Sequence, residues 1–187
     1  MFCDSFLGTE SQRTPTHRYG EEAVGFCIFG HRMRPPRARP LVMTEIAFHF
    51  NVPDKLAYAC RLLRKAAAAG APVGVVAPPQ ALRELDAALW SFSALDFVAH
   101  CDAAAPADML ERTPVVLAGD CAALPPRARV LVHLGDAVPA GFERFERLIE
   151  LVGIDGEDRA QARLRWRHYA DRGYPIQRHD LAAKAEE

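Results

Sequence analysis

The chain has 187 residues, half of them hydrophobic, which suits one folded domain with a buried core. Its formal net charge of −1 excludes a globally basic protein that coats nucleic acid, so any positive site must be local. The five cysteines are widely spaced without a C-x-x-C pattern, which indicates reduced thiols and argues against a disulfide framework or a zinc site. No stretch approaches the ~18 apolar residues of a membrane span, so a cytoplasmic protein without membrane contact is expected.

Residues 1–42 differ in composition from the rest of the chain. They mix Ser, Thr, Gly, Arg and Pro without periodicity and end in an Arg- and Pro-rich run from Arg32 to Pro40. Such a stretch buries too little apolar surface to order itself, so a disordered extension is expected. One interpretation is that Met43 is the natural initiator and that the extension comes from a misplaced start. The alternative is a genuine basic tail that touches nucleic acid or a partner.

From Met43 onward, strand-like and helix-like segments alternate. The sequence predicts strands at 44–50, 72–77, around 97–98, 114–118 and 129–134, and helices at 53–70, from 78 through 89, over 142–152 and from 156 to Gly173. This alternation implies right-handed βαβ crossovers, hence a three-layer, Rossmann-like α/β fold with a mostly parallel sheet and helices on both faces. The α/β domain is expected to span residues 43–178, followed by a loose tail at 179–187. The chain is expected to be loosely held already from Pro175 onward.

The strand-to-helix turns contain no motif for nucleotide binding or nucleophilic catalysis. The first turn, residues 50–54, lacks a glycine-rich phosphate loop, and the second loses an amide donor at each of Pro78 and Pro79. The triplet His100-Cys101-Asp102 could suggest a thiol nucleophile, but neighbours along an extended segment point to opposite sides. The sequence therefore favours a binding protein with no catalytic residue, cofactor, metal or small-molecule substrate.

The final predicted helix presents an unusual face. Arg159, Arg163, Trp166 and Arg167 recur at i, i+4, i+7 and i+8, which places them on one side of the helix. Arginine pairs bidentately with carboxylates or phosphates, and an indole adds apolar area for stacking. An anionic ligand with an apolar portion would fit this face. The alternative is a solvated helix whose Trp166 folds back onto the core.

Two segments resemble signatures of the chi subunit of bacterial DNA polymerase III holoenzyme. Residues 85–90 (LDAALW) followed by 96–100 (DFVAH) resemble the family's D-x-x-L-W … F-x-P-H pattern. Residues 163–169 (RLRWRHY) followed by Gly173-Tyr174 resemble its R-x-R-aromatic-basic-x-Y … G-aromatic pattern. The resemblance covers residues 43 to about 178. This chain departs from the family where Ala99 replaces the signature proline, and where Trp and Arg replace the commoner Tyr and Lys on the last helix.

The resemblance implies a non-catalytic accessory subunit of the clamp loader, with a nucleotide-binding-like fold that holds no nucleotide. Members of the family bind the acidic C-terminal peptide of single-stranded DNA-binding protein and, through another surface, the psi subunit. Contact with single-stranded DNA would be indirect. By position, Arg163 would meet the peptide's terminal carboxylate or an upstream Asp, with Arg159 and Arg167 beside it. Trp166 would pack on the peptide's Phe or Pro, and Tyr169 belongs to the same motif.

The psi-facing hypothesis rests on Trp90, Phe92, Phe97 and His100. Trp90 lies at the edge of an apolar helix stripe, where it can reach a partner or close the rim of the core. Two other classes of function stay open at this stage. One is a small α/β enzyme, which would need an anion loop. The other is a direct single-stranded DNA binder that uses Arg163, Trp166 and Arg167 as a stacking platform.

Overall fold

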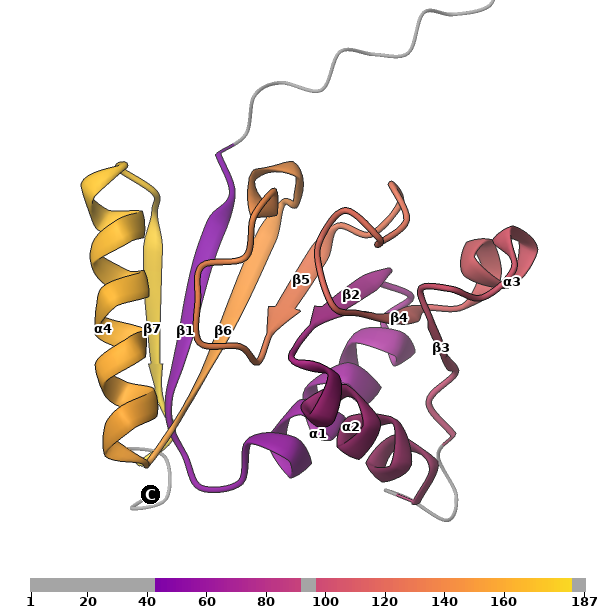
Figure 1. Cartoon of the computed structure of the whole chain (residues 1–187), viewed down its shortest axis with the longest axis horizontal. Coiled ribbons are helices and arrows are strands. Elements are labelled where there is room, and N and C mark those ends of the chain that lie inside the picture. Colours follow the sequence, from indigo (N-terminus) through magenta and orange to yellow (C-terminus); the bar gives the residue numbers. More distant parts are fainter. Residues whose placement is uncertain (1–42, 92–96, 183–187) are drawn as a thin grey trace, which may run out of the picture. The chain divides into compact units, whose positions relative to one another are not determined.

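A computed structural model describes residues 43–91 and 97–182 (Figure 1). The expected disordered extension over residues 1–42 and the candidate Phe92 therefore lie outside the described residues.

The described residues form a seven-stranded sheet in which every paired strand is parallel to its neighbour. The strands are β1 (Glu45–Val52), β2 (Val73–Val76), β3 (His100–Asp102), β4 (Val115–Ala118), β5 (Val130–His133), β6 (Arg147–Gly153) and β7 (Ile176–Asp180). Their order is β3-β4-β2-β5-β6-β1-β7, so the first and last strands in the sequence lie side by side at one edge (Figure 1).

Helices cover both faces of this sheet. They are α1 (Lys55–Ala68), α2 (Pro79–Ser91), α3 (Ala107–Arg112), the 3₁₀ helix η1 (Phe142–Arg144) and α4 (Gly156–Asp171). The side chains of β1 alternate between two cores, because Phe48 packs with the α4 side while Ala47 packs with α1 and α2. Figure 1 shows α1 and α2 side by side and α4 running along β7. The three-layer, Rossmann-like α/β prediction is confirmed.

The predicted helix over residues 142–152 is wrong. Only Phe142–Arg144 form a short 3₁₀ helix, and Arg147–Gly153 form strand β6, which lies between β5 and β1. Six of the seven residues in β6 are buried, because both faces of this central strand are covered. A strand buried on both faces gives a continuous apolar run, and such a run does not separate strand from helix by its period.

Smaller differences affect the segment before β4 and the C-terminal region. The strand predicted around residues 97–98 begins instead at His100, and helix α3 was not predicted. The expected loose tail after Pro175 contains strand β7, which pairs with β1 and places Asp180 opposite Phe50. An edge strand with polar side chains lacks the apolar alternation that would reveal it.

None of the helices among the described residues is long and apolar enough to cross a membrane. Within the same residues, no group of three or more His, Cys, Asp or Glu side chains is placed to hold a metal ion. The thiols of Cys60, Cys101 and Cys121 are buried and free, and burial raises the pKa of Cys121 to about 11. A protonated, buried thiol of this kind is a packing group and a poor nucleophile.

Candidate functional site

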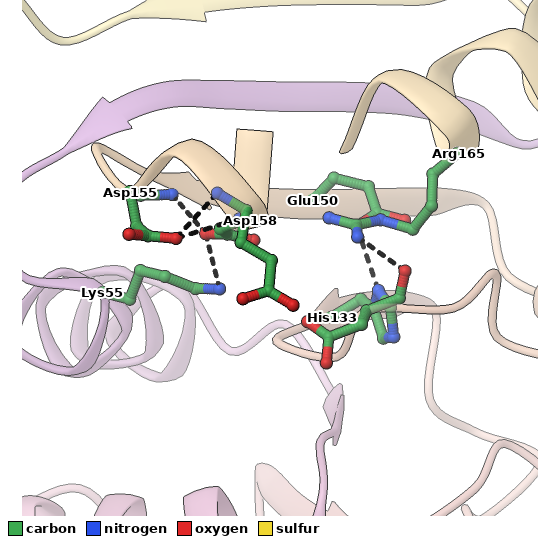
Figure 2. A network of polar contacts seen from close by, with 9 residues as sticks. Lys55, His133, Glu150, Asp155, Asp158 and Arg165 are labelled. Atoms are coloured by element: carbon green, nitrogen blue, oxygen red, sulfur yellow. Dashed lines mark hydrogen bonds and ion pairs between the residues drawn. The ribbon is translucent and has the colours of Figure 1, made fainter. Parts of the chain in front are cut away.

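Two aspartates fix the first turn of α4, one by capping the helix and one by joining it to the sheet. The Asp155 carboxylate caps the helix by accepting from the backbone N–H groups of Glu157 and Asp158, and these donors lower its pKa. The Asp158 Oδ2 atom accepts from the Gly153 backbone N–H at 2.6 Å and from Lys55 Nζ at 2.9 Å (Figure 2). These contacts join the start of α4 to the end of β6 and to α1.

The rest of α4 is fixed by a buried polar cluster around Glu150 on β6. This carboxylate is fully buried, and its Oε2 atom lies 2.9 Å from His133 Nδ1 and accepts from Arg165 Nε at 3.0 Å (Figure 2). Its Oε1 atom accepts from the Tyr169 hydroxyl at 2.7 Å, while Arg165 Nη1 donates to the Asp136 carbonyl at 2.8 Å. Two residues of α4 are thereby bound to one carboxylate in the sheet, which fixes the position of the helix on β6.

The Trp166 side chain, on α4, packs against aromatic rings of strand β1, near the edge of the sheet. It is half-buried, and its ring centroid lies 5.0 Å from that of Phe48 and 6.0 Å from that of Phe50. The guanidinium of Arg178, on β7, lies 5.6 Å from the Phe50 ring centroid and 6.0 Å from that of Trp166. A cation, two partly exposed rings and the arginines of α4 therefore share one surface.

Asn51, near the end of β1, links Arg159 of α4 to Asp180 of β7 at one side of this surface. It has a φ of 57°, a left-handed conformation that Asn tolerates better than most residues, and it lies at an irregularity in the β1–β6 pairing. Its side chain accepts from Arg159 Nη2 at 2.8 Å and donates to Asp180 Oδ1 at 2.7 Å. Arg159 is thereby held beside the strand ends.

A second exposed cluster lies at the other end of the sheet. Trp90 and Phe97 are 63% and 62% exposed, and their ring centroids are 5.1 Å apart. The His100 ring lies 5.3 Å from Trp90, with Nδ1 2.7 Å from the Val98 carbonyl oxygen and Nε2 3.1 Å from Asp86 Oδ1. The end of α2 and the segment leading into β3 thus present neighbouring aromatic rings to solvent.

The sequence of the folded region matches a protein family described as the DNA polymerase III chi subunit, HolC, over residues 43–177. The chain belongs to this chi subunit family. It is 35% identical over 148 residues to the DNA polymerase III subunit chi of Pseudomonas aeruginosa, a match that covers 74% of this chain and 98% of that protein. The resemblance noted in the two signature segments is confirmed.

One solved structure, the S. cerevisiae Dbp5 C-terminal domain bound to Gle1 and IP6, matches with a TM-score of 0.49 and 13% identity. That match covers 74% of this chain and 90% of the yeast domain. A structural match this weak gives no indication of the function of this chain.

The structure brings most of the residues predicted for the chi-family peptide site to one surface. Arg159, Arg163 and Arg167 are exposed on α4, next to the half-buried Trp166. The Trp166 ring packs against the core, as the alternative interpretation expects, and is still partly exposed, so its role in binding a ligand stays a prediction. Tyr169 is different: it has no exposed surface and donates to Glu150. Its assignment to the peptide site is corrected to a structural role.

The sequence interpretation missed two residues that shape the α4 surface, Arg165 and Arg178. Arg165 is 1% exposed and binds Glu150, although it lies among the surface arginines in the sequence. Ala162, Arg165 and Tyr169 are spaced at i, i+3 and i+7, which places Arg165 on the buried face of the helix. This spacing could have revealed its position from the sequence. Arg178 lies on a strand that the sequence did not predict, so no pattern indicated its place beside Trp166.

The triplet His100-Cys101-Asp102 does not form a catalytic group in the structure. Cys101 is buried in the core, while Asp102 Oδ1 accepts from the Ala104 backbone N–H in a local turn. The His100 ring lies 5.3 Å from that of Trp90, and its Nε2 atom lies 3.1 Å from Asp86 Oδ1. The alternation of an extended segment places the Cys101 side chain on the opposite side of the strand from those of its two neighbours, so the thiol is separated from His100 and Asp102.

Proposed function

We propose that this chain is a non-catalytic accessory subunit of the replicative clamp loader, and that it links single-stranded DNA-binding protein to the loader in the cytoplasm. The α4 surface binds the acidic C-terminal peptide of single-stranded DNA-binding protein. The observation that supports this role is the exposed set Arg159, Arg163 and Arg167 beside the half-buried Trp166 ring, on a helix fixed to the sheet by Glu150.

The chemistry of this surface suits a peptide that is acidic and ends in an apolar residue with a free carboxylate. Guanidinium groups bind carboxylates through paired hydrogen bonds, and the rings of Phe50 and Trp166 offer apolar area to a terminal Phe or Pro. Exposed ion pairs contribute only ~0–1 kcal/mol each, so apolar burial supplies much of the affinity. Binding is therefore weak and sensitive to salt, with Arg178 adding a cation beside the rings.

The test is fluorescence anisotropy of a labelled peptide ending in Asp-Asp-Ile-Pro-Phe, titrated with the full chain. Arg163→Ala is expected to weaken binding about tenfold or more, because it removes a charge-assisted hydrogen bond to the peptide. Arg112→Ala, which removes an exposed arginine from α3, is the matched control and is expected to bind as the unmodified chain does. Equal affinity of all three proteins would refute the assignment, and a C-terminally amidated peptide tests the role of the free carboxylate.

The psi subunit is proposed to bind the Trp90, Phe97 and His100 cluster, since an exposed pair of large aromatic rings is a typical centre of a protein interface. Trp90→Ala is expected to weaken psi binding at least tenfold in titration calorimetry and to leave peptide binding unchanged. Loss of peptide binding in the same variant, with psi binding intact, would contradict this division of surfaces.

A further inference from the structure

The exposed side of α1 is strongly basic. This helix carries Lys55, Arg61, Arg64 and Lys65 and contains no Asp or Glu. Lys55 forms an ion pair with Asp158. Arg61, Arg64 and Lys65 recur at i, i+3 and i+4 and are exposed on the side away from the sheet. Because α1 and α4 pack on opposite faces of the sheet, this basic ridge is separate from the proposed peptide surface.

A hollow of about 510 Å³ lies along one flank of this ridge. The lining includes Tyr58, Arg61, Lys65 and Arg147, together with the imidazoles of His49 and His179. No carboxylate occurs among these lining residues. Ile149, Val130 and Leu62 supply an apolar floor beneath the charges, and the volume is typical of a site that accepts a ligand of nucleotide size.

Rings and nitrogen donors share the walls of this hollow. The Arg61 guanidinium lies 5.6 Å from the Tyr58 ring centroid, and the His49 ring centroid lies 4.7 Å from that of His179. Arg147 donates from Nη2 to Glu45 at 3.1 Å, while its buried Nε has no hydrogen-bond partner among the described residues.

A second hollow, of about 830 Å³, lies on the other flank of α1. Arg61, Arg64 and Lys65 line it together with Phe97 and Pro114, and two of those cations, Arg61 and Lys65, also line the first hollow. The described residues that form this second hollow include no Asp or Glu either. A ridge of positive charge thus runs between two hollows, each of which has an aromatic ring in its wall.

We propose that this face of the protein binds single-stranded nucleic acid. The phosphates lie along Arg61, Arg64 and Lys65, and a base enters the hollow lined by Tyr58 and the two imidazoles. Cations that follow a backbone and rings that stack on bases are the two components of binding without sequence preference. This pairing of a ridge with ring-lined hollows favours a nucleic acid over an acidic peptide, which the α4 surface already suits.

The inference goes beyond the proposed function, because it gives the adaptor a direct contact with the strand. The net charge of the chain is −1, so a local ridge of three cations gives weak binding that falls steeply with salt. A weak contact of this kind would orient the protein on DNA that single-stranded DNA-binding protein has already coated.

The experiment measures anisotropy of a labelled oligothymidylate of about 20 nucleotides at low salt, with the full chain and two charge-reversal proteins. The Arg61→Glu/Lys65→Glu double variant is expected to lose at least tenfold in oligonucleotide affinity while keeping the acidic peptide. Arg163→Glu is expected to lose affinity for the acidic peptide and to keep its affinity for the oligonucleotide. The plot of log affinity against log salt concentration should become less steep, by about 0.7 in slope for each phosphate contact removed. Both replaced residues of α1 are exposed, and thermal unfolding checks that the variants fold.

Three results would overturn the inference. The unmodified chain could fail to bind the oligonucleotide at low salt. Arg163→Glu could abolish oligonucleotide binding while the α1 variant retains it, which would move nucleic-acid binding to α4. The α1 variant could instead lose the acidic peptide, which would make this face a peptide site. The peptide measurements with Arg163→Glu report separately on the proposed function, so failure of one proposal is distinguishable from failure of the other.

Discussion

Glu150→Ala is expected to lower the free energy of unfolding by about 3–5 kcal/mol, because it leaves the buried Arg165 without its carboxylate. His133 and the Tyr169 hydroxyl lose their partner in the same substitution. Urea unfolding followed by tryptophan fluorescence measures the effect. Since two of these groups anchor α4, the variant is also expected to bind the acidic peptide more weakly under conditions where it remains folded. A loss below about 1 kcal/mol would show that the cluster does not fix the helix.

Glu150→Gln separates the charge of this side chain from its shape. Burial by itself would raise the pKa of Glu150, but attraction to His133, a hydrogen bond from it, the charge of Arg165 and the Tyr169 hydroxyl together lower it below the ordinary 4.5. A lowered folded pKa stabilises the protein above pH 4.5, and this contribution is lost as the pH falls through the folded pKa. The difference in stability between the unmodified chain and Glu150→Gln should therefore shrink below pH 4.5. A constant difference from pH 7 to pH 3 would contradict the linkage.

Phe48→Ala is expected to cost about 3–5 kcal/mol of stability, in the range for removing a fully buried aromatic side chain. The Phe48 ring lies 5.0 Å from Trp166, 5.5 Å from Phe50 and 6.0 Å from Tyr169, measured between centroids. Its loss leaves a cavity beneath Trp166, so the ring proposed to receive the peptide is no longer held in place. Peptide affinity measured on the folded variant is expected to fall severalfold.

Phe48→Leu is the control for this cavity, because leucine keeps most of the apolar volume without an aromatic ring. It is expected to cost about 1–2 kcal/mol and to preserve most of the peptide affinity. Urea unfolding and peptide anisotropy on both variants make the comparison. Equal losses for Ala and Leu would mean that ring stacking, and not filled volume, supports Trp166.

The structure also explains how a chain with almost no net charge can carry locally positive surfaces. Two carboxylates are paired inside the fold: Glu150 binds Arg165 of α4, and Asp158 joins α4 to α1 through Lys55. The exposed side of α1 carries arginine and lysine with no Asp or Glu, whereas on α4 the exposed arginines lie between Glu157 in the first turn and Asp171 in the last. Charge balance over the whole chain therefore coexists with two separate positive surfaces.

Several features of this protein were determined by the sequence alone. The alternation of apolar segments predicts the parallel α/β fold, because helix and strand periods are set by local geometry. The spacing of Arg159, Arg163, Trp166 and Arg167 places them on one helix face for the same reason. The two signature segments led to the chi family, which the sequence match confirms.

Other features were decided only by the tertiary structure. Whether residues 147–153 form a helix or a strand depended on burial from both sides, which a single segment does not encode. The polar strand β7 forms because β1 offers it a hydrogen-bonding edge, and this pairing places Arg178 beside Trp166. Arg165 and Tyr169 point into the core because both donate hydrogen bonds to the buried carboxylate of Glu150, which lies on strand β6. Local periodicity specifies the face of a helix, but partners far apart in the chain decide which of its polar side chains are buried.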